Sequence, residues 1–185
     1  REASDMVKTN LARAAQLVQD FREVAVDRST EQSRLLSLKG YVEQVVSSIS
    51  PLYRGRPIEV EVRAEVDVEI ELSPGPLAQV ITNLVQNAVV HAFHDDESGT
   101  IRFNVSMANE WIELIYEDSG RGMSPGVQAT AFEPFTTTRR GKGGSGLGLF
   151  IVHNIITGSL GGRISLESTK GEGTRLLMRW PRAHT

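Results

Sequence analysis

The segment ITNLVQNAVVHAF, residues 81–93, combines a helical apolar stripe with two asparagines, and it carries much of the information on the fold. We predict a helix that begins after an N-cap at Ser73 and ends near His91. Its apolar face consists of Leu77, Val80, Ile81, Leu84, Val85 and Ala88. Asn83 and Asn87 lie four residues apart and therefore project from one face beside that stripe. A carboxamide oxygen can bind Mg²⁺ without adding negative charge beside phosphates. The alternative is a pair of solvent-facing asparagines.

The second chemical motif is DSGRG, residues 118–122, which follows a predicted strand over 111–116. The carboxylate of Asp118 at a strand end can accept a hydrogen bond from the exocyclic amine of adenine, whereas guanine would present the wrong group. Gly120 and Gly122 would let the chain turn against the base. The alternative is an ordinary turn, because Asp and Gly are both common in turns.

Glycine-rich sequence leads into another predicted helix at GSGLGL, residues 144–149, which is followed by FIVHNII. We expect this helix over 146–157. Backbone amides that are exposed where such a loop enters a helix can bind an anion. The chain contains no P-loop pattern, and the motif is not a dinucleotide fingerprint because it follows a loop rather than a strand. The alternative is a flexible loop before a capped helix.

Between the two glycine-rich motifs lies FEPFTTTRR, residues 132–140. Two aromatic residues and a proline can anchor a loop, while Arg139, Arg140 and Lys142 can neutralise phosphate charge. Residues 119–145 have little apolar periodicity, which predicts a mobile lid over phosphates. The alternative is a solvated basic loop.

The rest of the chain predicts an α/β sandwich. We expect strands over 35–38, 58–62, 66–72, 101–107, 111–116, 163–168 and 174–180, and a further helix over 39–50. This order of elements predicts a two-layer fold in which helices cover one face of a mixed, mostly antiparallel sheet.

Residues 2–28 predict one long helix before this domain. Its apolar residues Val7, Leu11, Ala14, Val18, Phe21 and Ala25 follow heptad spacing. At 1.5 Å per residue the helix would be roughly 40 Å long, which favours an intermolecular or hairpin bundle over packing on its own domain. Polar sequence at 27–32 marks a hinge. The predicted domains are therefore 1–32 and 33–185.

The composition excludes several classes of protein. A net charge of −3 argues against a large nucleic-acid surface, and the absence of cysteine excludes disulfides and thiolate metal sites. No run of about 18 apolar residues occurs. The chain starts at Arg1 with neither a methionine nor a signal-like segment. We therefore expect a fragment of a longer protein.

The order of the motifs is more specific than any one of them. Residues 36–181 resemble the ATP-binding catalytic domain of bacterial sensor histidine kinases, within the GHKL ATPase superfamily, in the order NLVQNA, DSGRG, FEPF and GSGLGL. Residues 2–28 are similar to the second helix of the dimerisation and phosphotransfer hairpin of such kinases. The resemblance implies the Bergerat α/β sandwich, with ATP bound between helices and lid.

The resemblance also implies roles for particular residues. Asn87 would hold the Mg²⁺ ion that bridges the phosphates, with Asn83 nearby, and Asp118 would bind the adenine amine. The other residues expected at the nucleotide are His91, Gly120, Gly122, Arg139, Gly144, Ser145, Gly146, Leu147, Gly148 and Thr174. Hydrolytic relatives such as gyrase carry a glutamate general base where Asn83 stands. An asparagine cannot take a proton there, which favours phosphoryl transfer to a histidine over attack by water.

Two features depart from the family pattern. Val90 stands where such kinases often carry a lysine or arginine, so one phosphate contact is either missing or supplied by Arg139. None of the four histidines, His91, His94, His153 and His184, fits the phosphoacceptor, which we expect upstream of this chain.

We therefore expect a cytoplasmic catalytic fragment that uses ATP and Mg²⁺. The parent protein would form a homodimer through its N-terminal hairpin and pass the phosphoryl group to a response-regulator receiver domain. It would bind no nucleic acid, and it would reach the inner membrane only through parts that this chain lacks. Two alternatives stay open: a degenerate, non-catalytic kinase-like module that regulates a partner kinase by docking, and a serine kinase of the anti-sigma type.

Overall fold

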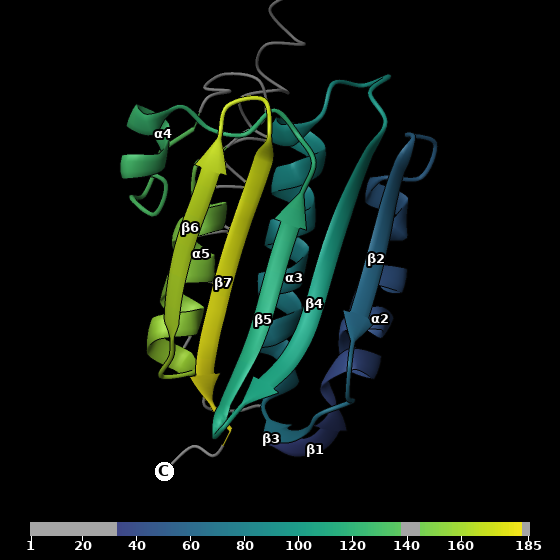
Figure 1. The fold of residues 1–185 in the computed structure, drawn as a ribbon, viewed down its shortest axis with the longest axis vertical. Coiled ribbons are helices and arrows are strands. Elements are labelled where there is room, and N and C mark those ends of the chain that lie inside the picture. Colours follow the sequence, from purple (N-terminus) through teal and green to yellow (C-terminus); the bar gives the residue numbers. More distant parts are fainter. Residues whose placement is uncertain (1–32, 138–144, 183–185) are drawn as a thin grey trace, which may run out of the picture.

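The computed structural model describes residues 33–137 and 145–182, which form a sheet with helices over one of its faces (Figure 1). The predicted helix over 2–28 and the hinge lie outside the described residues, so the domain boundary at residue 32 remains a prediction. Arg139, Arg140, Lys142, Gly144 and His184 lie outside them as well. In the described part of the chain, no helix is long and apolar enough to cross a membrane.

The main sheet has five strands in the order β2 (Ile58–Ala64), β4 (Gly99–Ala108), β5 (Trp111–Asp118), β7 (Gly173–Pro181) and β6 (Arg163–Thr169). β2 runs parallel to β4, and the other three neighbouring pairs are antiparallel. The predicted mixed, mostly antiparallel sheet is confirmed. A separate two-stranded sheet pairs β1 (Arg34–Ser37) with β3 (Glu69–Leu72).

Three helices form the second layer. They are α2 (Leu38–Ser48), α3 (Pro74–Asn87) and α5 (Gly148–Asn154), and Figure 1 shows all three on the same face of the sheet. A 3₁₀ turn, η1 (Ser50–Leu52), follows α2, while α3 and α5 continue into single π-helical turns, η2 (Ala88–Ala92) and η3 (Ile155–Ser159). The short helix α4 (Pro125–Ala129) lies beside β6.

The core fills the space between these layers. Along β4 the side chains of Ile101, Phe103 and Val105 are buried and alternate with more exposed polar ones, as the period of a strand requires. They meet the apolar face of α3, whose predicted members are all buried. Trp180 of β7 is completely buried in the same core.

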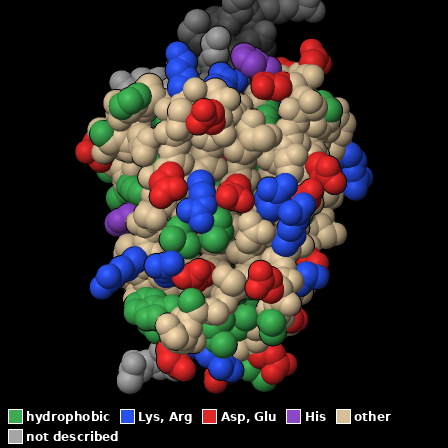
Figure 2. All heavy atoms as spheres, viewed as in Figure 1, with side chains coloured by type: hydrophobic (Ala, Val, Ile, Leu, Met, Phe, Trp, Pro, Cys, Tyr) green, Lys and Arg blue, Asp and Glu red, His purple; other side chains and the backbone are tan. Residues whose placement is uncertain are grey.

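The outer face of the sheet carries charged side chains in register. The residues Glu61, Arg102, Glu117, Arg175 and Glu167 are successive cross-strand neighbours over all five strands, and their charges alternate in sign. Arg102 Nε lies 3.0 Å from Glu61 Oε2, and Arg175 Nε lies 3.3 Å from Glu117 Oε1. Figure 2 shows this row of acidic and basic side chains on the solvent side of the sheet.

Several element boundaries differ from the sequence prediction. Val66 is 73% exposed and lies outside β3, so the strand predicted from residue 66 begins only at residue 69. The helix predicted from Gly146 begins at residue 148, because Gly146 has a φ of +74° that no helix accommodates. Residue 38 is the first residue of α2 rather than the last of a strand, because the Ser37 side chain caps that helix by accepting from Gly40 N.

Residues 119–145 contain a helix that sequence reasoning missed. Ser124 is the N-cap of α4, and Pro125 is its first helical residue. A serine followed by a proline is a common helix start. The helix has only five residues, which is too few for a periodic apolar pattern to show.

Candidate nucleotide site

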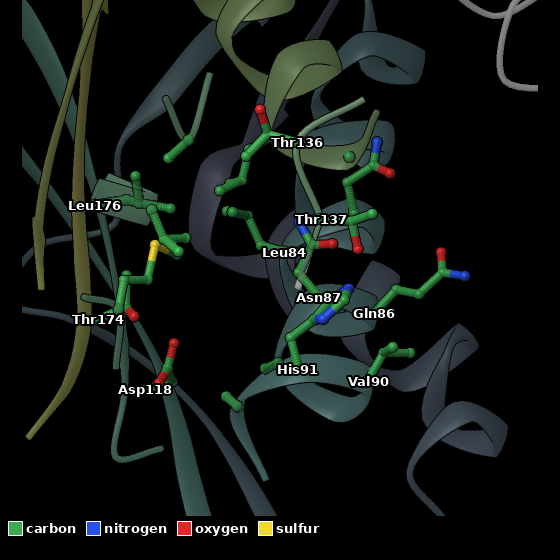
Figure 3. A pocket seen from close by; sticks show the side chains of 18 of the residues that line it. Leu84, Gln86, Asn87, Val90, His91, Asp118, Thr136, Thr137, Thr174 and Leu176 are labelled. Atoms are coloured by element: carbon green, nitrogen blue, oxygen red, sulfur yellow. The ribbon is translucent and has the colours of Figure 1, made fainter. Parts of the chain in front are cut away.

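A pocket of about 470 Å³ lies between the helix layer and the sheet. One wall is formed by α3 and η2, and the opposite wall by β5 and β7. The loop that follows β5 and the start of α5 complete it. Figure 3 shows Asp118 and Thr174 on the strand side, facing Asn87 and His91 on the helix side, with Thr136 and Thr137 at a third side.

Asp118, the last residue of β5, is a buried carboxylate on the strand wall and is 9% exposed. Its Oδ2 accepts a hydrogen bond from Tyr116 Oη at 2.8 Å, and its Oδ1 accepts from Gly120 N at 3.0 Å. Burial raises the pKa of Asp118 above its usual value, and the hydrogen bonds from Tyr116, Gly120 and the Thr174 backbone counteract this rise. Thr174 of β7 is the cross-strand partner of Asp118, so both side chains reach the pocket together.

Two glycines bring the loop after β5 close to its neighbours. A Cβ at Gly120 would collide with Ala92 at the end of η2, and Arg121 N donates to Ala92 O at 2.9 Å. Gly122 has a φ of +60°, and a Cβ there would collide with the backbone of Thr169 in the β6–β7 hairpin. Gly122 lines the pocket, whereas Gly120 does not line it and donates its N–H to the Asp118 carboxylate.

Asn83, Asn87 and His91 line the helix wall, spaced by one turn each. The Nδ2 atom of Asn87 is buried and has no hydrogen-bond partner among the described residues. A Cβ at Gly148 would lie 2.8 Å from Asn87 Oδ1, so α5 begins directly against this carboxamide. A larger residue at position 148 would push the amide away.

Arg56 holds the end of this helix wall from outside the pocket. Its Nη1 donates to Val89 O at 2.6 Å, and its Nη2 donates to His94 O at 2.7 Å. A cation at the C-terminal end of a helix also complements the helix dipole. The π-helical turn that carries His91 is therefore fixed by a side chain from the loop before β2.

The start of α5 meets the segment that contains FEPF. Gly146 has a positive φ, and a Cβ there would lie 2.6 Å from the carbonyl carbon of Phe135. Leu147 is 4% exposed and belongs to the core, and its N–H donates to Ser145 Oγ at 3.3 Å. Ser145, Gly146 and Gly148 line the pocket, whereas Leu147 does not.

The pocket thus gathers most of the described residues predicted to bind nucleotide. These are Asn83, Asn87, His91, Asp118, Gly122, Ser145, Gly146, Gly148 and Thr174. Val90 also lines it, so the position that departs from the family pattern faces the site. His153 lies outside the pocket, with its ring 5.2 Å from that of Phe132.

Sequence reasoning missed several lining residues, among them Tyr116, Arg121 and Lys170. Tyr116 precedes Asp118 by two residues on a strand, and this spacing places both side chains on one face. Arg121 lies inside the DSGRG motif, and its Nε and Nη2 atoms are buried without a hydrogen-bond partner within the described residues. Lys170 carries no local signal, because only the fold brings the β6–β7 turn to the pocket.

Comparison with known proteins agrees with this geometry. Residues 72–184 match the family described as histidine kinase-, DNA gyrase B- and HSP90-like ATPase. The chain is 34% identical over 131 residues to the alginate biosynthesis sensor protein KinB of Pseudomonas aeruginosa, covering 69% of this chain and 21% of that protein. It is 32% identical over 142 residues to the sensor protein TorS of Escherichia coli, covering 76% of this chain and 15% of TorS. The chain therefore spans a quarter or less of the length of these relatives.

Solved structures show the same fold. The nucleotide-free catalytic domain of histidine kinase ThkA superposes with a TM-score of 0.69 at 25% identity, covering 82% of this chain and 98% of that one. Full-length ShkA, solved in complex with AMPPNP, gives a TM-score of 0.73 at 25% identity, covering 100% of this chain and 38% of ShkA. With a family match over more than half of its length, the chain belongs to the histidine kinase-, DNA gyrase B- and HSP90-like ATPases.

Proposed function

We propose that this chain is the ATP-binding catalytic part of a sensor histidine kinase. The whole protein would transfer the γ-phosphoryl group of ATP to a histidine outside this chain, for relay to an aspartate of a response regulator. One observation carries the proposal: the buried carboxylate of Asp118 faces the carboxamide of Asn87, whose buried Nδ2 has no partner among the described residues, across one pocket. These groups suit the two ends of a nucleotide.

Asp118 would bind the base. Its Oδ2 accepts from Tyr116 and its Oδ1 from Gly120 N, and the Thr174 backbone also donates to the carboxylate. An ionised carboxylate has about four lone-pair sites, so one remains for an external donor. The exocyclic amine of adenine is such a donor, whereas the O6 carbonyl of guanine would face the carboxylate with an acceptor. The site should therefore prefer ATP to GTP.

Asn87 fits a role at the phosphates and their metal ion. Its carboxamide offers an oxygen that suits Mg²⁺ and a buried N–H group that can donate to a phosphate oxygen. No group of three His, Cys, Asp or Glu residues that could hold a metal occurs in residues 33–137 and 145–182. A magnesium ion would thus take most of its oxygen ligands from ATP and water, and it would neutralise phosphate charge.

The helix wall lacks a general base at the position that hydrolytic relatives use. Asn83 lines the pocket one turn before Asn87 and cannot accept a proton from water. Its neutral amide leaves the γ-phosphoryl group for a stronger nucleophile, such as a histidine nitrogen supplied from outside the pocket. Catalysis would then consist of positioning and charge stabilisation.

The remaining assignments concern the whole protein. We place this domain on the cytoplasmic side, and we assign dimerisation to the hairpin whose second helix would be residues 2–28. The sensor proteins that match this chain support a receiver domain as the partner.

Calorimetry of this chain with Mg-ATP and Mg-GTP tests the proposal. We expect saturable binding of ATP and at least about tenfold weaker binding of GTP, since one mismatched buried hydrogen bond costs about 1–3 kcal/mol. Equal affinities would remove the role of Asp118 in base recognition. Absence of ATP binding would contradict the proposed function as a whole.

A further inference from the structure

Tyr116 is joined to Asp118 by a buried hydrogen bond. Its hydroxyl donates to Asp118 Oδ2 at 2.8 Å, and both side chains lie on the buried face of β5, which is covered by the helices. The side chain is only 2% exposed, and its ring packs edge-on against Phe103, with centroids 5.5 Å apart and planes at 63°. Packing therefore holds the Tyr116 ring in addition to its hydrogen bond with the carboxylate.

Tyr116 and Gly120 donate to different oxygens of Asp118. Gly120 N occupies one lone pair of Oδ1, and Tyr116 occupies one lone pair of Oδ2. Together they fix the rotation of the carboxylate plane, and with it the direction in which the remaining lone pair points. Without the Tyr116 hydroxyl only backbone donors would remain, and the carboxylate could turn more freely about its Cβ–Cγ bond, because such sp³–sp² torsions are broad.

We propose that Tyr116 is a positioning residue that orients the Asp118 carboxylate toward the amine of adenine and thereby sets the preference for ATP over GTP. The inference rests on the proposed function, since it assumes that Asp118 recognises the base. The inference gives Tyr116, which lies outside the DSGRG motif, a role in base selection beside Asp118.

The same hydrogen bond favours the ionised carboxylate. Burial raises the pKa of Asp118, and the Tyr116 hydroxyl is the largest of the influences that lower it again. The pKa of Tyr116 itself is raised well above its usual value by burial, so it remains a donor at neutral pH. The other titratable groups that line the pocket within the described residues are His91 of η2, Arg121 of the loop after β5 and Lys170 of the β6–β7 turn.

The direction of the pH effect follows from these contacts. Only the ionised carboxylate presents both oxygens as acceptors, because protonation turns one of them into a donor. ATP affinity should therefore fall as the pH drops through the pKa of Asp118. Removal of the Tyr116 hydroxyl raises that pKa further. The variant should therefore lose ATP affinity at a higher pH than the unaltered chain.

The test is calorimetry with ATP and GTP on Tyr116→Phe across a pH series. We expect ATP to bind about 3- to 10-fold more weakly, the size of one ordinary hydrogen bond, because the carboxylate is kept and only its orientation is loosened, with little change for GTP. The midpoint of the ATP profile should move to higher pH. Tyr53→Phe is the matched control, because the Tyr53 hydroxyl donates to Val46 O at 3.2 Å and does not line the pocket.

A double-mutant cycle separates positioning from direct contact. If Tyr116 acts through Asp118, Tyr116→Phe should have little further effect on ATP affinity in an Asp118→Asn background. A full loss in that background would overturn the inference. So would a single variant that keeps the ATP affinity, the GTP discrimination and the pH midpoint of the unaltered chain.

The remaining outcomes separate this inference from the proposed function. Failure of the unaltered chain to bind ATP overturns both, whereas normal ATP binding with an unaffected Tyr116→Phe variant overturns the inference alone. Should that variant fail to fold, 3-fluorotyrosine in place of the tyrosines provides a more acidic donor. The pH midpoint should then move downward, and an unchanged midpoint would overturn the inference.

Discussion

The two walls of the pocket differ in how completely their polar groups are satisfied. On the strand wall, both oxygens of Asp118 accept hydrogen bonds from the protein itself. On the helix wall, the Nδ2 of Asn87 is buried with no partner in the described part of the chain. An unpaired buried donor costs about 1–3 kcal/mol, and a ligand in the pocket could complete the hydrogen bonding of Asn87.

The difference indicates that the two ends of the nucleotide are recognised in different ways. The base would enter a site that is organised before binding, which supports discrimination between bases. The phosphates and their metal ion would complete a site that the protein leaves unfinished. Substitutions on the strand wall should therefore change affinity and specificity, whereas substitutions on the helix wall should change turnover most.

The largest effect is expected for Asn87→Ala on the helix wall. In the full-length protein, phosphotransfer should fall by about 100-fold or more, because misplaced phosphates lose the geometry of transfer. ATP affinity should fall much less, since the strand wall is untouched. Autophosphorylation and ATP binding should be measured together. Asn104→Ala is the control, because Asn104 contacts Glu117 on the outer face of the sheet. Near-normal phosphotransfer in Asn87→Ala would contradict the metal assignment.

A smaller effect is expected for Asp118→Asn on the strand wall. ATP binding should weaken by about 1–3 kcal/mol, because a charged acceptor is replaced by a group that can present a donor. GTP binding should change little, so the ratio of the two affinities falls. Glu117→Gln is the matched control, since the neighbouring carboxylate points to the outer face and pairs with Arg175. An unchanged ratio in Asp118→Asn would place base recognition elsewhere.

Local sequence patterns predicted parts of both pocket walls: Asn83, Asn87 and His91 on the helix wall, and Asp118 at the end of β5 on the strand wall. Period-two alternation and the DSGRG motif place Asp118 at the end of a buried strand, and the structure has it there. Asp118 pairs with Thr174 across β5 and β7, and this register is set by the fold and not by a local pattern. Tyr116 could have been found by the same alternation.

Other features depend on tertiary contacts that no local pattern encodes. The GSGLGL motif indicates a helix start, but the start lies at residue 148 because Gly146 has a positive φ beside the backbone of Phe135. The Arg56 side chain donates to carbonyl groups in and just after η2, which are more than 30 residues away in the sequence. Contacts of this kind depend on tertiary packing, so composition and periodicity do not predict them.

A still smaller effect is expected for Gly148→Ala, which tests the contact between α5 and Asn87. The new methyl group would lie 2.8 Å from Asn87 Oδ1, and the amide can rotate away, so the fold should survive. Phosphotransfer should drop by roughly 10-fold through the displaced amide. Gly158→Ala in η3 is the control, because a Cβ there meets no atom within 4 Å in the described structure. It should keep its activity and gain up to about 1 kcal/mol of stability. Equal phosphotransfer activities for the two variants would show that the contact between Gly148 and Asn87 does not affect phosphotransfer.

The smallest effect concerns stability and compares Asp118 with a carboxylate on the outer face. Folding raises the pKa of Asp118 through burial, whereas the hydrogen bond from Arg102 lowers the pKa of Glu61. A raised pKa means that the folded state binds the proton more tightly than the unfolded one, so this group stabilises the fold increasingly as the pH falls through its folded pKa. A lowered pKa acts in the opposite sense, and the contribution of Glu61 is lost as the pH falls through its folded value. The melting temperature of Asp118→Asn should therefore exceed that of the unaltered chain most at pH 7, and this difference should shrink in acid. Glu61→Gln should show a small deficit at pH 7 that closes in acid. Thermal unfolding from pH 7 to pH 4 measures how the melting-temperature difference between each variant and the unaltered chain changes with pH. If the two differences change with the same sign, burial does not raise the pKa of Asp118.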